Sequence, residues 1–238
     1  MKIAVISGSE KSGTSFIATN LASVGNYAYF DCDFINPKAN FYFEENNATT
    51  TEHYEDVFDL NSTTFNNSTC CVSANTSKNL FIGNEFSYLN EKVKVYYGKT
   101  SNVNFRKALF DKILNQAQFT NVYFDLPSKI SDFTLHAIKN ADYCLIVTEP
   151  TALNFDEFKG CLRAVKLLSK PYGIVFNKTT LLPQQFEDYC YQVNANVLAS
   201  FPTYLKEEKL ISNCELLSKL KLTYKQAFLA LHQQLKKK

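Results

Sequence analysis

The sequence lacks any apolar run that approaches the roughly 20 residues needed to span a bilayer. It also lacks an excess of one charge, because 25 Lys and Arg residues against 23 Asp and Glu residues give a formal net charge of +2. This balance gives no general case for nucleic acid or an anionic membrane as a partner, and we expect no nucleic acid to bind. Residues 1–7 form a buried-strand pattern with a single lysine and do not resemble a signal peptide.

Patterns typical of disulfide frameworks and metal sites are missing as well. The seven cysteines are odd in number and scattered, whereas a disulfide framework favours paired spacings in a much shorter chain. His53, His136 and His232 lie far apart, so we expect isolated histidines rather than metal ligands. Cys144 and Cys161 fall in predicted core segments and suit small buried side chains. Together these features predict a reducing, cytoplasmic location.

The length of 238 residues allows one large α/β domain with a sizeable core. Apolar runs predict strands at residues 2–7, 27–30, 121–124, 143–147, 172–176 and 196–199. Helical spacing predicts helices at residues 15–24, 102–116, 131–140, 155–168, 184–192 and 214–235. This alternation indicates a mainly parallel sheet with right-handed crossovers, whose ligands bind at the carboxyl ends of the strands.

One segment, residues 44–100, differs in composition from the rest of the chain. It is rich in Asn, Thr, Ser and Glu, and carries weak strand patterns near Cys70–Ser73, Asn79–Ile82 and Val93–Tyr97. We interpret it as an insert within a single domain that covers residues 1–238.

A glycine-containing loop, Gly8-Ser9-Glu10-Lys11-Ser12-Gly13-Thr14-Ser15, follows the first predicted strand. The phosphate-binding P-loop pattern is G-x-x-x-x-G-K-[ST]. Gly8, Gly13 and Ser15 match it, but Thr14 occupies the position of the essential lysine. An ordinary strand-to-helix turn would also use two glycines, so the loop alone leaves both interpretations open.

The opening stretch MKIAVISGSEKSGTSFIATNLA resembles that of the MinD/ParA-type ATPases, the CobQ/CobB/MinD/ParA nucleotide-binding family. Their deviant loop has the form K-G-G-x-G-K-[ST]. In this chain Ser9 stands at the signature lysine, which in the family reaches across a dimer to the partner's nucleotide. Glu10 and Lys11 stand at the two glycines, and Thr14 at the loop lysine. The resemblance implies a P-loop NTPase-like, doubly wound, mainly parallel α/β sheet with an inserted segment.

The ends of four later strands continue the resemblance in the correct order. Asp31-Cys32-Asp33 resembles the family's D-x-D segment, which implies that Asp33 orients the attacking water in an active enzyme. Residues 121–127, NVYFDLP, resemble the Walker B strand, which implies that Asp125 lies near Mg²⁺ together with Ser15. Residues 142–150 resemble the strand that ends in T-E-P. Asn177 ends a strand where the family places an adenine contact. The implied nucleotide site comprises Gly8, Lys11, Ser12, Gly13, Thr14, Ser15 and Asn177.

The departures from the family pattern weaken this site. The loop lysine donates charge-assisted hydrogen bonds to phosphates, worth about 1.5–3 kcal/mol each, whereas Thr14 offers a neutral hydroxyl. Glu10 adds a negative charge. We therefore expect weak or absent Mg-ATP binding. Asp33 and Asp125 are nevertheless retained, and they suit either residual Mg-nucleotide binding or structural hydrogen bonds.

The nearest branch of the family carries a ferredoxin insert that holds Fe–S clusters through C-x-x-C-x-x-C runs. Residues 44–100 offer only the adjacent Cys70 and Cys71, which cannot supply four thiolates, so we expect no Fe–S cluster.

Two functions remain open on the sequence. The first is a non-hydrolysing pseudo-ATPase scaffold that binds a protein partner, either a second copy in a homodimer or an active paralogue. The second is a divergent ATPase in which Lys11 or a partner's residue replaces the missing lysine. The last helix has an apolar face and ends in three lysines. Such a pattern is typical of a membrane-targeting helix and also of a helix that docks on the core. We expect docking on the core, without membrane contact.

Overall fold

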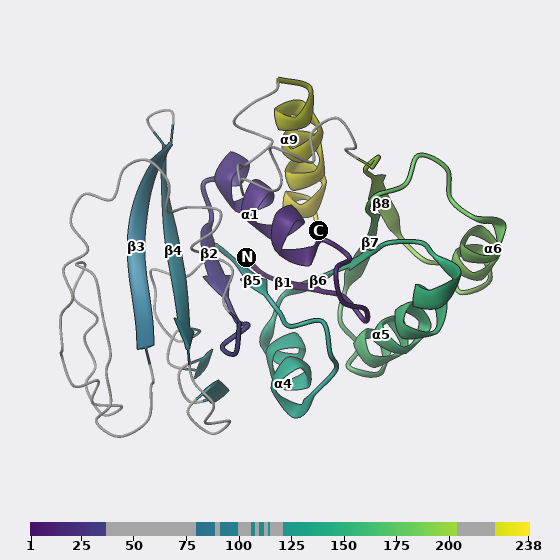
Figure 1. Cartoon of the computed structure of the whole chain (residues 1–238), viewed down its shortest axis with the longest axis horizontal. Helices are drawn as coiled ribbons and strands as arrows, with labels where there is room; N and C mark the ends of the chain where they lie inside the picture. Colours follow the sequence, from purple (N-terminus) through teal and green to yellow (C-terminus); the bar gives the residue numbers. More distant parts are fainter. Residues whose placement is uncertain are drawn as a thin grey trace.

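The computed structural model describes residues 1–36, 80–88, 91–99, 106–107, 110–111, 114, 121–203 and 222–238. Within these residues the strands form one eight-stranded sheet in the order β3-β4-β2-β5-β1-β6-β7-β8, which crosses the middle of the molecule in Figure 1. The strands are β1 (Lys2–Ile6), β2 (Ala28–Asp31), β3 (Leu80–Tyr88), β4 (Glu91–Lys99), β5 (Val122–Asp125), β6 (Tyr143–Thr148), β7 (Tyr172–Phe176) and β8 (Val197–Ser200). All neighbouring pairs are parallel except β3 with β4. The predicted mainly parallel sheet is confirmed.

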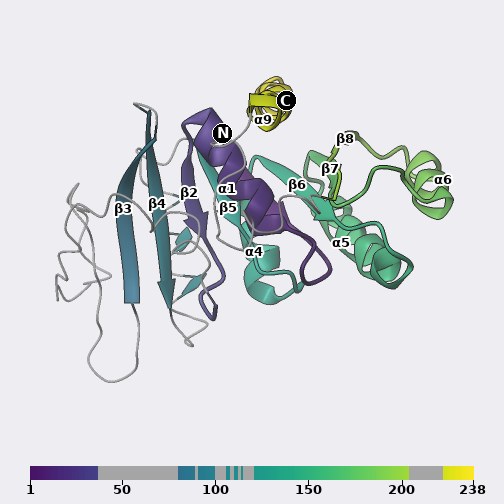
Figure 2. The same cartoon turned by 45° about the horizontal axis from the view of Figure 1, so that its top comes forward.

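Helices cover both faces of this sheet. Helices α1 (Thr14–Gly25) and α9 (Leu222–Lys236) lie together on one face. Helices α4 (Asp132–Asn140), α5 (Phe155–Leu167) and α6 (Gln184–Gln192) lie on the other, as Figures 1 and 2 show; the short 3-10 helix η2 (Ala152–Asn154) precedes α5. Alternate residues of β1 enter the two separate cores, Ile3 and Val5 on the α1 side and Ala4 and Ile6 on the other. The fold is therefore doubly wound.

Part of the segment that we interpret as an insert belongs to the main sheet. Strand β4 pairs in parallel with β2, with Tyr29 opposite Val95 and Phe30 opposite Tyr96. Strand β3 then pairs antiparallel with β4. The weak strand pattern near Cys70–Ser73 lies outside the described residues, as do most of residues 102–116 and the first turns of the predicted last helix.

The last helix docks on the core, as expected. Phe228, Leu231 and Leu235 of α9 are buried, and Phe228 packs edge-on against Phe16 of α1. His232 is buried in the same interface. Its Nδ1 lies 2.6 Å from the hydroxyl of Tyr123 in β5. Burial, followed by the charge of Lys236, lowers the pKa of His232 to about 4, so the ring is neutral at pH 7. No described helix is long and apolar enough to span a membrane.

Two cysteines that the sequence places in the core are indeed buried, and a second described histidine has a charged neighbour. Cys144 and Cys161 are fully buried, and burial raises the pKa of each thiol to about 12, so both act as small core side chains. His136 pairs with Asp111, with Nε2 2.6 Å from Oδ1. His53 lies outside the described residues.

Candidate phosphate-loop site

The loop between β1 and α1 is shaped by two close approaches of its glycines. A Cβ atom added to Gly8 would lie 2.3 Å from the carbonyl oxygen of Glu157 in α5. Gly13 precedes α1 with φ +86°, and a Cβ there would lie 2.1 Å from Nδ2 of Asn177. Both positions therefore require glycine for packing, whether or not the loop holds a phosphate.

Serine hydroxyls close the loop on itself. The hydroxyl of Ser7 donates to the carbonyl oxygen of Ser9 at 3.0 Å. The hydroxyls of Ser9 and Ser12 lie 2.7 Å apart, and Ser12 also donates to the Ser9 carbonyl at 3.2 Å. Lys11, at the tip, adopts a left-handed backbone with φ 60°. Ser9, at the signature lysine position, is thus part of an internal hydrogen-bond network.

The first backbone N–H groups of α1 take no part in the hydrogen bonding of the described residues. Among the described residues, the backbone N–H groups of Gly13, Thr14 and Ser15 donate no hydrogen bond, and the first bond into the helix runs from Ile17 N to Gly13 O at 3.0 Å. Such N–H groups carry a partial positive charge. Glu10 does not fill this position, because its carboxylate lies 3.6 Å from the ammonium of Lys129 and both side chains are exposed.

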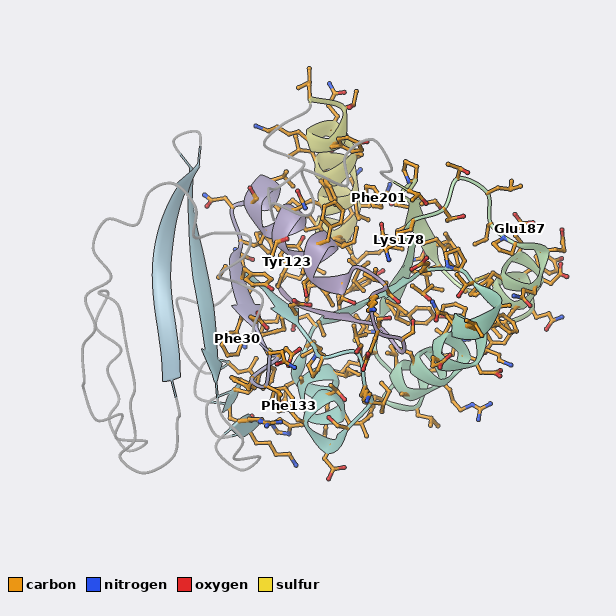
Figure 3. The ribbon with its side chains drawn as sticks, viewed as in Figure 1. Phe30, Tyr123, Phe133, Lys178, Glu187 and Phe201 are labelled. Carbon is orange, nitrogen blue, oxygen red and sulfur yellow. The ribbon has the colours of Figure 1, made fainter. Side chains whose placement is uncertain are left out.

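The end of β7 holds the loop in place. Nδ2 of Asn177 donates to the carbonyl oxygen of Ser12 at 2.9 Å. The ammonium of Lys178, labelled in Figure 3, donates to the carbonyl oxygen of Lys11 at 2.6 Å and pairs with Glu149 at 2.9 Å. Sequence reasoning missed Lys178, although it directly follows Asn177. The loop is therefore tied to the ends of β6 and β7.

The retained aspartates make hydrogen bonds within the chain. Asp125, at the end of β5, accepts a 2.8 Å hydrogen bond on Oδ2 from the hydroxyl of Tyr29. Asp31 accepts a 2.9 Å bond from the backbone N–H of Asp33. Asp33 in turn accepts from the N–H groups of residues 35 and 36 at 3.3 and 3.1 Å. All three carboxylates thus contribute to the local structure.

These carboxylates surround Cys32, whose pKa is raised well above its usual value by burial and further by Asp31, Asp125 and Asp33. No group of three or more His, Cys, Asp or Glu residues able to hold a metal ion is found in the described part of the chain.

The structure brings together most of the predicted site. The glycine loop and Asn177 are in direct contact. Asp31 and Asp125 lie side by side at the ends of neighbouring strands. The predicted residues therefore share one edge of the sheet, where the lysine that contacts the loop is Lys178, two residues after β7.

No protein-family profile matches the sequence, and no curated protein matches it. Solved structures do. The structure of the septum site-determining protein MinD of Pyrococcus horikoshii with Mg-ADP has 14% identity and a TM-score of 0.68, with 98% of this chain and 95% of that chain covered. A chain of the MinC:MinD cell division protein complex of Aquifex aeolicus has 16% identity and a TM-score of 0.66, with 100% of this chain and 96% of that chain covered. A plasmid partition protein of Borrelia burgdorferi has 12% identity and a TM-score of 0.62, with 99% of this chain and 97% of that chain covered.

The chain therefore has the α/β fold of the P-loop NTPases. Within that class its fold is of the MinD/ParA type, as the order of the motifs implied.

Proposed function

We propose that this chain is a MinD/ParA-like scaffold that binds a protein partner and does not hydrolyse ATP. One observation carries the proposal. Asp125, which the resemblance places near Mg²⁺, accepts a 2.8 Å hydrogen bond from the hydroxyl of Tyr29, and the neighbouring phosphate loop lacks its lysine. Phosphoryl transfer depends on positioning and charge neutralisation, and both lysine positions are filled by neutral side chains, Ser9 and Thr14.

The residues do not fit a Mg-nucleotide site of the family type. Thr14 is nearly buried at the start of α1 and brings no charge to a phosphate. Asp33, which would orient the attacking water, accepts two backbone hydrogen bonds on Oδ1, so this oxygen is engaged within the chain. Each feature alone would weaken hydrolysis, and together they favour a fold retained for binding.

A rim of exposed apolar side chains supports a protein partner. Ile35, Ile130, Leu153 and Leu181 are 56, 39, 87 and 81% exposed. They follow β2, β5, β6 and β7, so all four lie beyond the carboxyl ends of parallel strands, Leu153 within η2. Contiguous exposed apolar patches are typical of protein interaction sites, and we propose that these four side chains contribute to one. We propose that a second copy of this chain or an active paralogue binds here.

A divergent ATPase is the second candidate, and two observations favour it. The N–H groups of Gly13, Thr14 and Ser15 donate no hydrogen bond in the described part of the chain, so they could donate to the oxygens of a phosphate. Lys178 brings an ammonium to the loop, and its charge could replace that of the missing lysine. Lys11 is exposed at the loop tip and could serve in the same way. We rank this candidate second because Glu149 already pairs with Lys178.

The two candidates are separated by phosphate release from the purified protein. The scaffold predicts release at the background rate in the wild type and in Asp33→Ala alike. Steady release that disappears in Asp33→Ala would favour the ATPase, because a contaminating enzyme would not respond to that substitution.

The partner-binding half of the proposal is tested by sedimentation velocity. If a second copy binds at the rim, the double substitution Leu153→Ser and Leu181→Ser should weaken self-association. The matched control is Leu167→Ser, which is 77% exposed at the far end of α5 and should leave it unchanged. If the double variant and Leu167→Ser self-associate equally, the rim is not the surface through which two copies bind.

A further inference from the structure

We propose that Tyr29 takes the place of a divalent cation at Oδ2 of Asp125, so that this carboxylate oxygen has a partner from within the protein. The two side chains are both buried, with Tyr29 0% and Asp125 3% exposed. The Tyr29 hydroxyl donates to Oδ2 of Asp125 at 2.8 Å. The inference rests on the same hydrogen bond as the proposed function, but it concerns the metal alone and does not depend on which partner the chain binds.

The geometry of the sheet explains why a tyrosine at this position reaches the carboxylate. Strands β2 and β5 are parallel neighbours, with Asp31 opposite Asp125 and Tyr29 opposite Tyr123. Tyr29 is two residues before Asp31, so its side chain is on the same face of the sheet as that of Asp125. Two residues of a strand rise about 6.6 Å, which a tyrosine ring and its hydroxyl can span. A phenylalanine would end short of the carboxylate.

Electrostatics explains why the hydroxyl matters. A buried carboxylate is costly unless a cation or hydrogen-bond donors compensate it. The Tyr29 hydroxyl is such a donor, and its distance of 2.8 Å from Oδ2 is the usual one for an O–H···O hydrogen bond. At a metal site, the cation or its bound water would compensate the carboxylate. Here the hydroxyl of Tyr29 does so from within the protein. The neighbouring Asp31 and Asp33 also take backbone N–H donors.

The test is thermal melting of the full chain with EDTA and with millimolar Mn²⁺, a probe for divalent cations. In EDTA, Tyr29→Phe should lower the melting midpoint by several degrees, because Oδ2 of Asp125 loses the Tyr29 hydroxyl. Mn²⁺ should restore a substantial part of that loss in Tyr29→Phe and leave the wild type unmoved. The double variant Tyr29→Phe/Asp125→Asn should not respond to Mn²⁺.

The matched control is Tyr143→Phe, which removes another tyrosine hydroxyl from the same core; that hydroxyl accepts a 3.3 Å bond from Asn196. If Tyr143→Phe lowers the melting midpoint, Mn²⁺ should not restore any of that loss. The proposal is overturned if Mn²⁺ raises the wild-type midpoint as much as that of Tyr29→Phe. It is equally overturned if Tyr29→Phe costs nothing, or if its loss does not respond to Mn²⁺, since Tyr29 would then only pack.

If Tyr29→Phe does not fold, a Mn²⁺ titration of the wild type followed by electron paramagnetic resonance decides the matter. Saturable binding that Asp125→Asn removes would overturn the proposal, and the absence of such binding would support it.

Discussion

The side-chain amide of Asn177 and the carbonyl oxygen of Ser12 are joined by a 2.9 Å hydrogen bond, although 165 residues separate them in the sequence. The bond fixes the phosphate loop against the end of β7, and the Asn177 side chain is buried beneath it. A residue that the resemblance assigns to adenine binding thus has a structural partner in this chain.

Replacing Asn177 with alanine should lower the free energy of unfolding by about 1–3 kcal/mol, because a buried carbonyl loses its donor. Asn140→Ala is a matched control, since it removes a bond of the same type, from Nδ2 to the carbonyl oxygen of His136 at 2.9 Å, at an exposed site. Urea denaturation of both variants measures the difference. Equal losses in the free energy of unfolding would show that the buried Asn177 bond contributes no more than the exposed one.

Gly8→Ala should destabilise the protein by about 1–3 kcal/mol, because the new Cβ has no room beside a backbone carbonyl. That contact would be 2.3 Å from the oxygen of Glu157. Gly160→Ala, in the exposed part of α5 where a Cβ meets nothing within 4 Å, should instead stabilise. The gain should be up to about 1 kcal/mol from helix propensity. Opposite signs in chemical denaturation are the expected result, and two values of the same sign would contradict it.

Stability should fall in acid partly through His232, whose pKa is lowered to about 4 from its ordinary value of 6.5. Between these two pH values the unfolded chain binds a proton that the folded chain does not, so stability is lost as the pH falls from 6.5 toward 4. The loss specific to this group should be on the order of 2–3 kcal/mol. Denaturation at pH 7 and pH 4.5 should show a larger drop for the wild type than for His232→Gln. Equal drops would mean that His232 titrates normally in the fold.

Restoring the family loop should restore nucleotide binding. The variant with Ser9→Lys, Glu10→Gly, Lys11→Gly and Thr14→Lys should bind Mg-ATP at least about tenfold more tightly than the wild type, because one charge-assisted bond is worth that factor. Adding Tyr29→Phe should strengthen the binding further by releasing Asp125. Isothermal titration calorimetry measures both steps. A folded loop variant without nucleotide binding would mean that the site has diverged beyond its loop.

Short-range patterns predicted much of the fold. Alternation of apolar strands and helices along the chain is set by neighbouring residues, so the parallel core from β5 to β8 and the buried positions of Cys144 and Cys161 were accessible from the sequence. The two loop glycines at their fixed spacing likewise predicted the strand-loop-helix unit around Gly8 and Gly13.

Contacts between distant residues were not accessible in this way. Tyr29 and Asp125 are 96 residues apart, and their bond depends on the register of β2 against β5. Lys178 has a long side chain whose destination no spacing rule fixes, yet it reaches Lys11 across 167 residues. The aspartates matched a catalytic pattern, and only the three-dimensional neighbours revealed their structural bonds.

The most direct test of the account is thermal melting of the wild-type protein with and without saturating Mg-ATP. A ligand held only by the native state must raise the melting midpoint. Because the lysines are absent and Asp125 is bonded to Tyr29, we predict an unchanged midpoint. A rise that grows with Mg-ATP concentration and is lost in Asp125→Asn would contradict the account and identify the chain as a working nucleotide-binding protein.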